Sequence, residues 1–79
     1  MGLAKTQKEW QTRTRAFLKA KLTETSITYA ELVKRLEPHG FKETEASITM
    51  KLKRGTFAAT FFLACLAAME RDGVRLEEI

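Results

Sequence analysis

KLKRGTFAATFFLACLAAM, residues 51–69, joins the most basic part of this 79-residue chain to its most apolar part. Lys51, Lys53 and Arg54 place three cations within four residues, directly before a segment that has almost no polar side chains. Because Gly55 separates the two parts, and glycine readily ends a helix in a left-handed conformation, we expect two helices that meet at a sharp angle. The apolar helix would then hold the basic helix in place, with its charges turned toward water.

The apolar segment, residues 57–69, has thirteen residues. A helix needs about 20 apolar residues to cross a bilayer, so this segment predicts a core helix rather than a membrane anchor. Cys65, the only cysteine, lies in the middle of the segment, where we interpret it as a small buried hydrophobe in a reducing compartment. The N-terminus lacks the apolar stretch of a secretion signal. These features predict a cytoplasmic protein without membrane contact.

Capping signals and apolar spacing predict the remaining helices. Thr6 and Glu9, and again Thr28 and Glu31, have the three-residue spacing of a capping box. Pro38 disfavours helical geometry at the residue before it and so ends the second helix. The predicted helices cover about residues 7–22, 29–37, 44–54 and 57–70. The whole chain, residues 1–79, is therefore predicted to be a single all-α domain.

The last predicted helix is apolar almost all round, which is typical of a helix in the middle of a domain. We expect Thr56 to cap it and Trp10 to anchor the first helix against it. After Gly73 the apolar residues alternate only imperfectly, so the tail is predicted to be a short strand or a frayed end.

The net charge of +4 is distributed unevenly along the chain. Residues 1–22 carry six Lys or Arg against one acid, and residues 51–54 carry three against none. Residues 23–50 and 70–79 each have a net charge of −2. This separation can create a basic face on a nearly neutral protein, and such a face is what contacts with nucleic-acid phosphates require.

Three segments carry a resemblance to known proteins: YAELVKRLEPHGF at 29–41, ASITMKLKRGTF at 46–57 and FFLACLAAM at 61–69. Together they resemble the Cro/C1-type, lambda-repressor-like helix-turn-helix family. They are still more similar to a family of small, uncharacterised bacterial proteins with the pattern YAEL…G…I…KL.RG.F.A.F…CL. The resemblance implies a four-helix helix-turn-helix domain that binds double-stranded DNA, as in a small bacterial transcriptional regulator.

The chain departs from the usual helix-turn-helix pattern at several positions. Leu36 and Ile48 are twelve positions apart, more than in the common motif, so we expect a lengthened turn. Ile48 and Leu52, the two expected core contacts of the third helix, are four residues apart rather than three. Glu70 stands where this group usually has a glycine that ends the helix.

The resemblance implies that the helix at 44–54 reads DNA. The candidates for contacts with base edges are Ser47, Thr49, Met50 and Lys51, and those for phosphate contacts are Lys53 and Arg54. Arg13, Arg15 and Lys19 of the first helix are candidates for flanking phosphates. Because lysine and arginine supply mostly salt-dependent affinity, the predicted sequence selectivity is weak.

Other classes of function find little support in the sequence. His39 is the only histidine and lies beside Pro38 and Gly40 in a predicted turn, and no Cys/His cluster or phosphate-binding glycine loop accompanies it. We therefore predict no enzyme, catalytic residue, metal, cofactor or small-molecule ligand. The alternative function is a protein-interaction module that keeps the fold without DNA affinity. The choice between DNA and RNA stays open, and a homodimer formed through residues 74–79 or the last helix is a further hypothesis.

Overall fold

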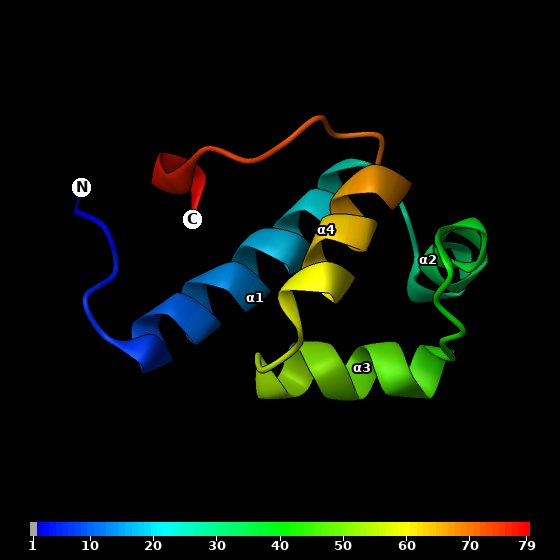
Figure 1. Ribbon diagram of the computed structural model, residues 1–79, viewed down its shortest axis with the longest axis horizontal. Coiled ribbons are helices and arrows are strands. Elements are labelled where there is room, and N and C mark those ends of the chain that lie inside the picture. Colours follow the sequence, from blue (N-terminus) through cyan, green and yellow to red (C-terminus); the bar gives the residue numbers. More distant parts are fainter. Residues whose placement is uncertain (1) are drawn as a thin grey trace.

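The computed structural model describes residues 2–79, and within that range it consists of helices without a β-strand. The helices are α1 (Gln7–Glu24), α2 (Tyr29–Leu36), α3 (Glu45–Arg54) and α4 (Ala59–Ala68), with 3₁₀ turns at Glu37–His39 and Leu76–Glu78. Figure 1 shows α3 lying below α1 and α4, while α2 is seen end-on at the right. The all-α prediction is confirmed, and within residues 2–79 no helix has the length and apolar character needed to cross a bilayer.

Side-chain caps fix the starts of the first three helices. The Thr6 and Thr28 hydroxyls accept from the backbone N–H three residues on, as predicted. The Glu31 carboxylate does not complete its capping box, because it binds Arg35 instead at 3.0 Å. The start of α3 has a complete box that was not predicted, formed by Thr44 and Ser47. Both side chains are therefore engaged in beginning this helix.

Two glycines in left-handed conformation turn the chain on either side of α3. Gly40 has a φ of 87° and ends the 3₁₀ turn Glu37–His39 that follows α2. Gly55 has a φ of 72° and ends α3, as the sequence predicts. A Cβ at position 55 would lie only 3.2 Å from the backbone oxygen of Gln11 in α1. Glycine is therefore required there both by its backbone conformation and by the close approach of α1.

The core is formed by apolar side chains from all four helices, and Ile48 and Leu52 are completely buried in it, as predicted. Rings of Phe17 and Phe62, with centroids 6.2 Å apart, link α1 to α4. Because α3 contributes only two fully buried side chains, most of its surface is left on the outside.

The structure corrects the predicted last helix in two respects. The helix begins at Ala59 rather than Phe57, and Ala58 precedes it without a side-chain cap, so Thr56 does not cap it. The helix also does not lie in the middle of the domain, since its outer face is exposed and its Leu63 side chain is 60% exposed. Phe57 packs on Phe61 from the segment before the helix, with 5.4 Å between ring centroids.

The C-terminal tail is neither a strand nor a frayed end. It crosses back along α1 toward the N-terminus, as Figure 1 shows in orange and red. The Arg71 guanidinium donates to both oxygens of Glu78 at 3.0 and 3.1 Å and lies 5.4 Å from the Phe17 ring centroid. Val74 and Ile79 pack against the core. The apolar residues of the tail therefore largely cover the domain itself.

Glu70, just after α4, is a non-glycine residue in the left-handed conformation. It has a φ of 60°, and the hydrogen bonds Glu70 N–H to Ala67 O and Arg71 N–H to Leu66 O, both 2.9 Å, close a left-handed helix end. Because this conformation is unfavourable for a residue with a Cβ, Glu70→Gly should raise the free energy of unfolding by about 0.5 to 1 kcal/mol in urea denaturation. Glu70→Ala removes the same charge but keeps the strain, so an equal gain from both variants would contradict this explanation.

Candidate nucleic-acid interface

The outer face of α3 is the surface that the buried pair Ile48 and Leu52 leaves turned to solvent. Successive helical residues are rotated by about 100°, so the side chains opposite the buried pair point outward. The outer face of α3 consists of Ala46, Thr49, Met50, Lys53 and Arg54, all exposed. Met50 is 48% exposed, and the Thr49 hydroxyl donates to the Glu45 carbonyl at 2.8 Å. Four of the predicted contact residues therefore share one accessible face.

Ser47 and Lys51, the two other candidates on α3, lie on its inner edge and are held by Glu43. The Ser47 hydroxyl donates to Glu43 Oε1 at 2.6 Å, and Lys51 Nζ donates to Glu43 Oε2. The Lys51 ammonium also lies 4.5 Å from the centroid of the Phe61 ring. Neither side chain is directed outward as the sequence analysis expected, so a base contact by either would require breaking these bonds.

Glu43 is a structural residue that the sequence analysis did not identify. Its side chain is only 8% exposed, although it belongs to the segment that precedes α3. Burial by itself raises the pKa of this carboxyl, but hydrogen bonds from Lys51 and Ser47, together with the Lys51 charge, hold it below its ordinary value of 4.5. The ionised carboxylate therefore fixes the inner edge of α3 to the fold.

Replacing Glu43 should reveal this role as a pH-dependent loss of stability. We expect Glu43→Gln to lower the free energy of unfolding by about 1 to 2 kcal/mol at neutral pH, because Lys51 loses its partner. The lowered pKa means that the unfolded chain binds the proton first, so the stabilisation is present above the ordinary value of 4.5 and is lost as the pH falls through the folded pKa.

The measurement is urea unfolding of wild type and variant between neutral and acid pH. The difference between the two proteins should shrink on acidification. Glu37→Gln is the matched control, since Glu37 is exposed and forms no ion pair within the described part of the chain. A difference in unfolding free energy between wild type and Glu43→Gln that does not change with pH would contradict a stabilising role for the ionised Glu43 carboxylate. An equal loss of stability in Glu37→Gln would contradict it as well.

Arg15 joins α1 to the end of α3. Its Nη1 donates to the backbone oxygen of Lys53 at 2.6 Å, and thus neutralises a carbonyl at the negative end of the α3 dipole. Arg35 does the same for α4 by donating to Ala68 O at 3.1 Å. A guanidinium has five N–H donors, so Arg15 retains others for a phosphate. Lys19, one turn after Arg15, is exposed on the same side of α1.

Arg13 stands apart from this group. It is two residues from Arg15, which places it on a different side of α1, and its Nη1 donates to Gly2 O at 2.9 Å. The structure thus brings Arg15 to the end of α3 that carries Lys53 and Arg54, with Lys19 one turn further along α1, and we call these four cations the α1–α3 basic surface. It does not bring Arg13 to that surface.

The α1–α3 basic surface keeps its positive charge because its members lack acidic partners. Five ion pairs form among residues 2–79: Lys21–Glu24, Arg35–Glu31, Lys51–Glu43, Arg71–Glu78 and Arg75–Glu77. None of them includes a cation of the α1–α3 basic surface. Charges left unpaired in this way are available to an anionic partner. The four cations of this surface equal the net charge of +4 of the whole chain, so the positive charge is concentrated on one side.

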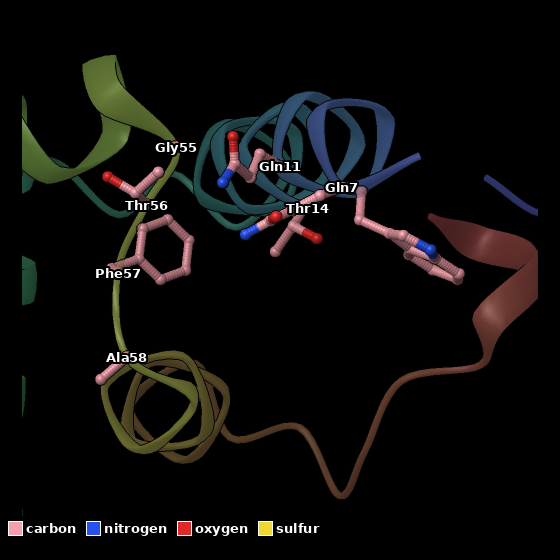
Figure 2. Close-up of a pocket in the computed structure, with 8 residues that line it drawn as sticks. Gln7, Gln11, Thr14, Gly55, Thr56, Phe57 and Ala58 are labelled. Atoms are coloured by element: carbon pink, nitrogen blue, oxygen red, sulfur yellow. The ribbon is translucent and has the colours of Figure 1, made fainter. Parts of the chain in front are cut away.

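A shallow groove lies beside this surface, between α1 and the segment that leads into α4. Its volume is about 470 Å³, and Figure 2 shows Gln7, Gln11 and Thr14 on the α1 side with Phe57 opposite. Trp10 also lines it. This side chain is half-buried and belongs neither to the core nor to the apolar side chains packed against it, so the predicted core anchor is wrong.

Neither a reactive thiolate nor a metal-binding cluster is found among residues 2–79. Burial first, and then the nearby Glu43 charge, raises the pKa of the Cys65 thiol to about 12, so that it stays protonated at neutral pH. Among residues 2–79, no three His, Cys, Asp or Glu side chains are placed to hold a metal ion. The α1–α3 basic surface and the neighbouring groove are the candidate features for a nucleic-acid interface.

Comparison with the curated proteins and with the solved structures found no match. Residues 10–74 match a protein family that is described as "Domain of unknown function (DUF6471)". The matched range contains most of α1 and all of α2, α3 and α4, together with the outer face of α3. The match spans well over half of the chain, and the protein therefore belongs to the DUF6471 family.

Proposed function

We propose that this protein binds double-stranded DNA as a helix-turn-helix domain. In this arrangement α2 supports α3, and α3 lays its outer face in the major groove. The contact between α2 and α3, the left-handed Gly40 in the turn between them, and the exposure of Met50 support this orientation. The role that fits is that of a small regulator of transcription.

The α1–α3 basic surface is the observation that carries the proposal. Arg15 binds the last turn of α3 directly, so cations from two helices are held beside one another rather than spread along the chain. Lys53 and Arg54 would contact phosphates next to the groove, and Arg15 and Lys19 would contact phosphates on the flank. The rest of the chain carries ten Lys or Arg and ten Asp or Glu, so this side, which accounts for the net charge of +4, is the one that would face DNA.

We expect the protein to discriminate only weakly between DNA sequences. Thr49 and Met50 are the exposed candidates for base edges, and a threonine contacts several bases while methionine offers an apolar surface. Most of the affinity would therefore come from phosphates and counterion release.

A salt titration tests the proposal. Binding of the wild-type protein to a random-sequence duplex should reach micromolar affinity at low salt, and the logarithm of the affinity should fall linearly as the logarithm of the salt concentration rises. With about four phosphate contacts, the slope should be about −3 to −4. Failure to bind at about 50 mM salt, which is low enough for strong non-specific binding, would contradict the proposal and favour protein interaction.

A second candidate function, protein interaction, is favoured by the outer face of α4. Leu63 is 60% exposed between the small exposed residues Ala59 and Ala67, and α4 carries no charged side chain. A homodimer is one form that such an interaction would take. Light scattering at high protein concentration would then give the mass of two chains, and a mass of one chain would exclude the homodimer.

A further inference from the structure

Trp10 is the largest aromatic side chain of the protein and its only tryptophan, yet it is left outside the core. The ring is half-buried, and its N–H is accessible to water rather than buried without a partner. None of the hydrogen bonds formed among residues 2–79 involves the Trp10 side chain. One side of this ring borders the groove between α1 and the segment before α4. The ring therefore presents an accessible aromatic surface to the groove.

We propose that this groove receives one unpaired nucleobase of a nucleic-acid strand whose phosphates lie on Lys53 and Arg54. The inference rests on the proposed function and adds a base-binding site to it. Aromatic rings are the usual platforms on which proteins stack unpaired bases, and Trp10 and Phe57 both line the groove. Gln7 and Gln11 each offer an amide that donates and accepts, which suits the edge of a base.

The charge distribution matches a nucleotide rather than an isolated anion or a charged peptide. No charged side chain lines the groove itself, so it suits a neutral base. The cations begin at its margin, because Arg54 directly precedes the lining residue Gly55. A Cβ at Gly55 would lie 3.6 Å from Arg15 Cδ, which shows how closely the α1–α3 basic surface adjoins the groove. Aromatic side chains that can stack on bases, next to cations that can contact phosphates, are typical of binding sites for single-stranded nucleic acids.

The size and openness of the site fit one base that remains attached to its strand. Its volume of about 470 Å³ lies in the range of small-ligand pockets, roughly 300 to 1,000 Å³. Figure 2 shows the side chains of Gln11 and Thr14 facing this space across from Phe57. An unpaired base next to a duplex could therefore enter while the adjoining duplex contacts the α1–α3 basic surface.

Three DNA probes test this site: a blunt duplex, the same duplex with a short thymidine overhang, and the same duplex with an abasic overhang of equal length. Fluorescence anisotropy gives the affinities, and Trp10 emission reports directly on the groove, since no other tryptophan contributes. The thymidine overhang should increase affinity at least about fivefold over the abasic overhang, which has the same phosphates but no bases. Trp10 emission should be quenched by the thymidine overhang and not by the abasic one.

Variants at Trp10 make the test specific. Trp10→Ala should abolish the difference between the two overhangs, and Trp10→Phe, which keeps an aromatic face, should preserve most of it. Equal affinity of wild type for both overhangs, with unchanged Trp10 emission, would overturn the inference even if Trp10→Ala fails to fold. Base-dependent binding of the overhang without binding of the blunt duplex would overturn the duplex proposal alone. No binding of any probe would overturn both.

Discussion

The double variant Lys53→Ala/Arg54→Ala is expected to bind random-sequence duplex DNA about 10- to 100-fold more weakly than wild type at low salt. Both side chains are exposed on the outer face of α3, and neither forms an ion pair within residues 2–79. Because each phosphate contact contributes about 0.9 to the salt slope, the magnitude of that slope should fall by about 2. Lys51 is left in place, since its ion pair with Glu43 belongs to the fold.

The matched control removes the same charge from elsewhere. Lys5→Ala/Lys34→Ala replaces two exposed lysines that lie outside the α1–α3 basic surface. We expect this control to weaken binding only slightly, through the lower net charge, and to leave the salt slope nearly unchanged. Equal losses in the two double variants, with both folded by circular dichroism, would show that charge in general and not the end of α3 binds DNA.

The substitution Leu52→Ala is expected to cost about 2 to 5 kcal/mol of unfolding free energy. Leu52 is completely buried, and its removal leaves a cavity where α3 meets the core. A domain of this size has a total stability of only about 4 to 12 kcal/mol, so the variant should lose a large fraction of its unfolding free energy. Urea denaturation at lower temperature, followed by circular dichroism, gives the value.

Met50→Ala on the same helix is the control for this prediction. Met50 is 48% exposed, and alanine is a favourable helix residue, so the free energy of unfolding should change by less than about 0.5 kcal/mol. If Leu52→Ala were as harmless as Met50→Ala, α3 would not be anchored by its buried face. Its outer face would then have no fixed orientation toward DNA.

Local signals predicted the elements around α3 well because each depends on few residues. Thr28 and Thr6 accept the expected N–H groups, and Ile48 and Leu52 are buried as their helical spacing indicates. Gly55 ends α3 in the left-handed conformation that glycine adopts readily. In these cases the chemistry of one residue and its spacing are sufficient.

The inner edge of α3 could not be predicted because it depends on a segment outside the helix. Helical rotation places Ser47 and Lys51 away from Ile48 and Leu52, but it carries no information on where Glu43 lies. The buried Glu43 carboxylate draws both side chains inward. Glu43 lies just before the N-cap of α3, outside the regular helix, so helical periodicity does not define the position of its side chain.

The misplaced residues of α4 and α1 have similar causes. Thr56 has the right chemistry for a cap, yet α4 begins two residues later than predicted, and Phe57 packs on Phe61 from the segment before the helix. Trp10 was predicted to anchor the first helix against the last, but Phe17 supplies the ring that meets Phe62 on α4. Competition between several aromatic residues for one core cannot be decided from apolar spacing alone.

Mapping of backbone amide chemical shifts by NMR, during titration with duplex DNA, tests the central claim most directly. The account predicts that the largest changes lie at residues 49–54 of α3 and near Arg15 and Lys19 of α1, while Leu63 on the outer face of α4 changes little. Changes concentrated on the outer face of α4, with α3 unaffected, would contradict the account.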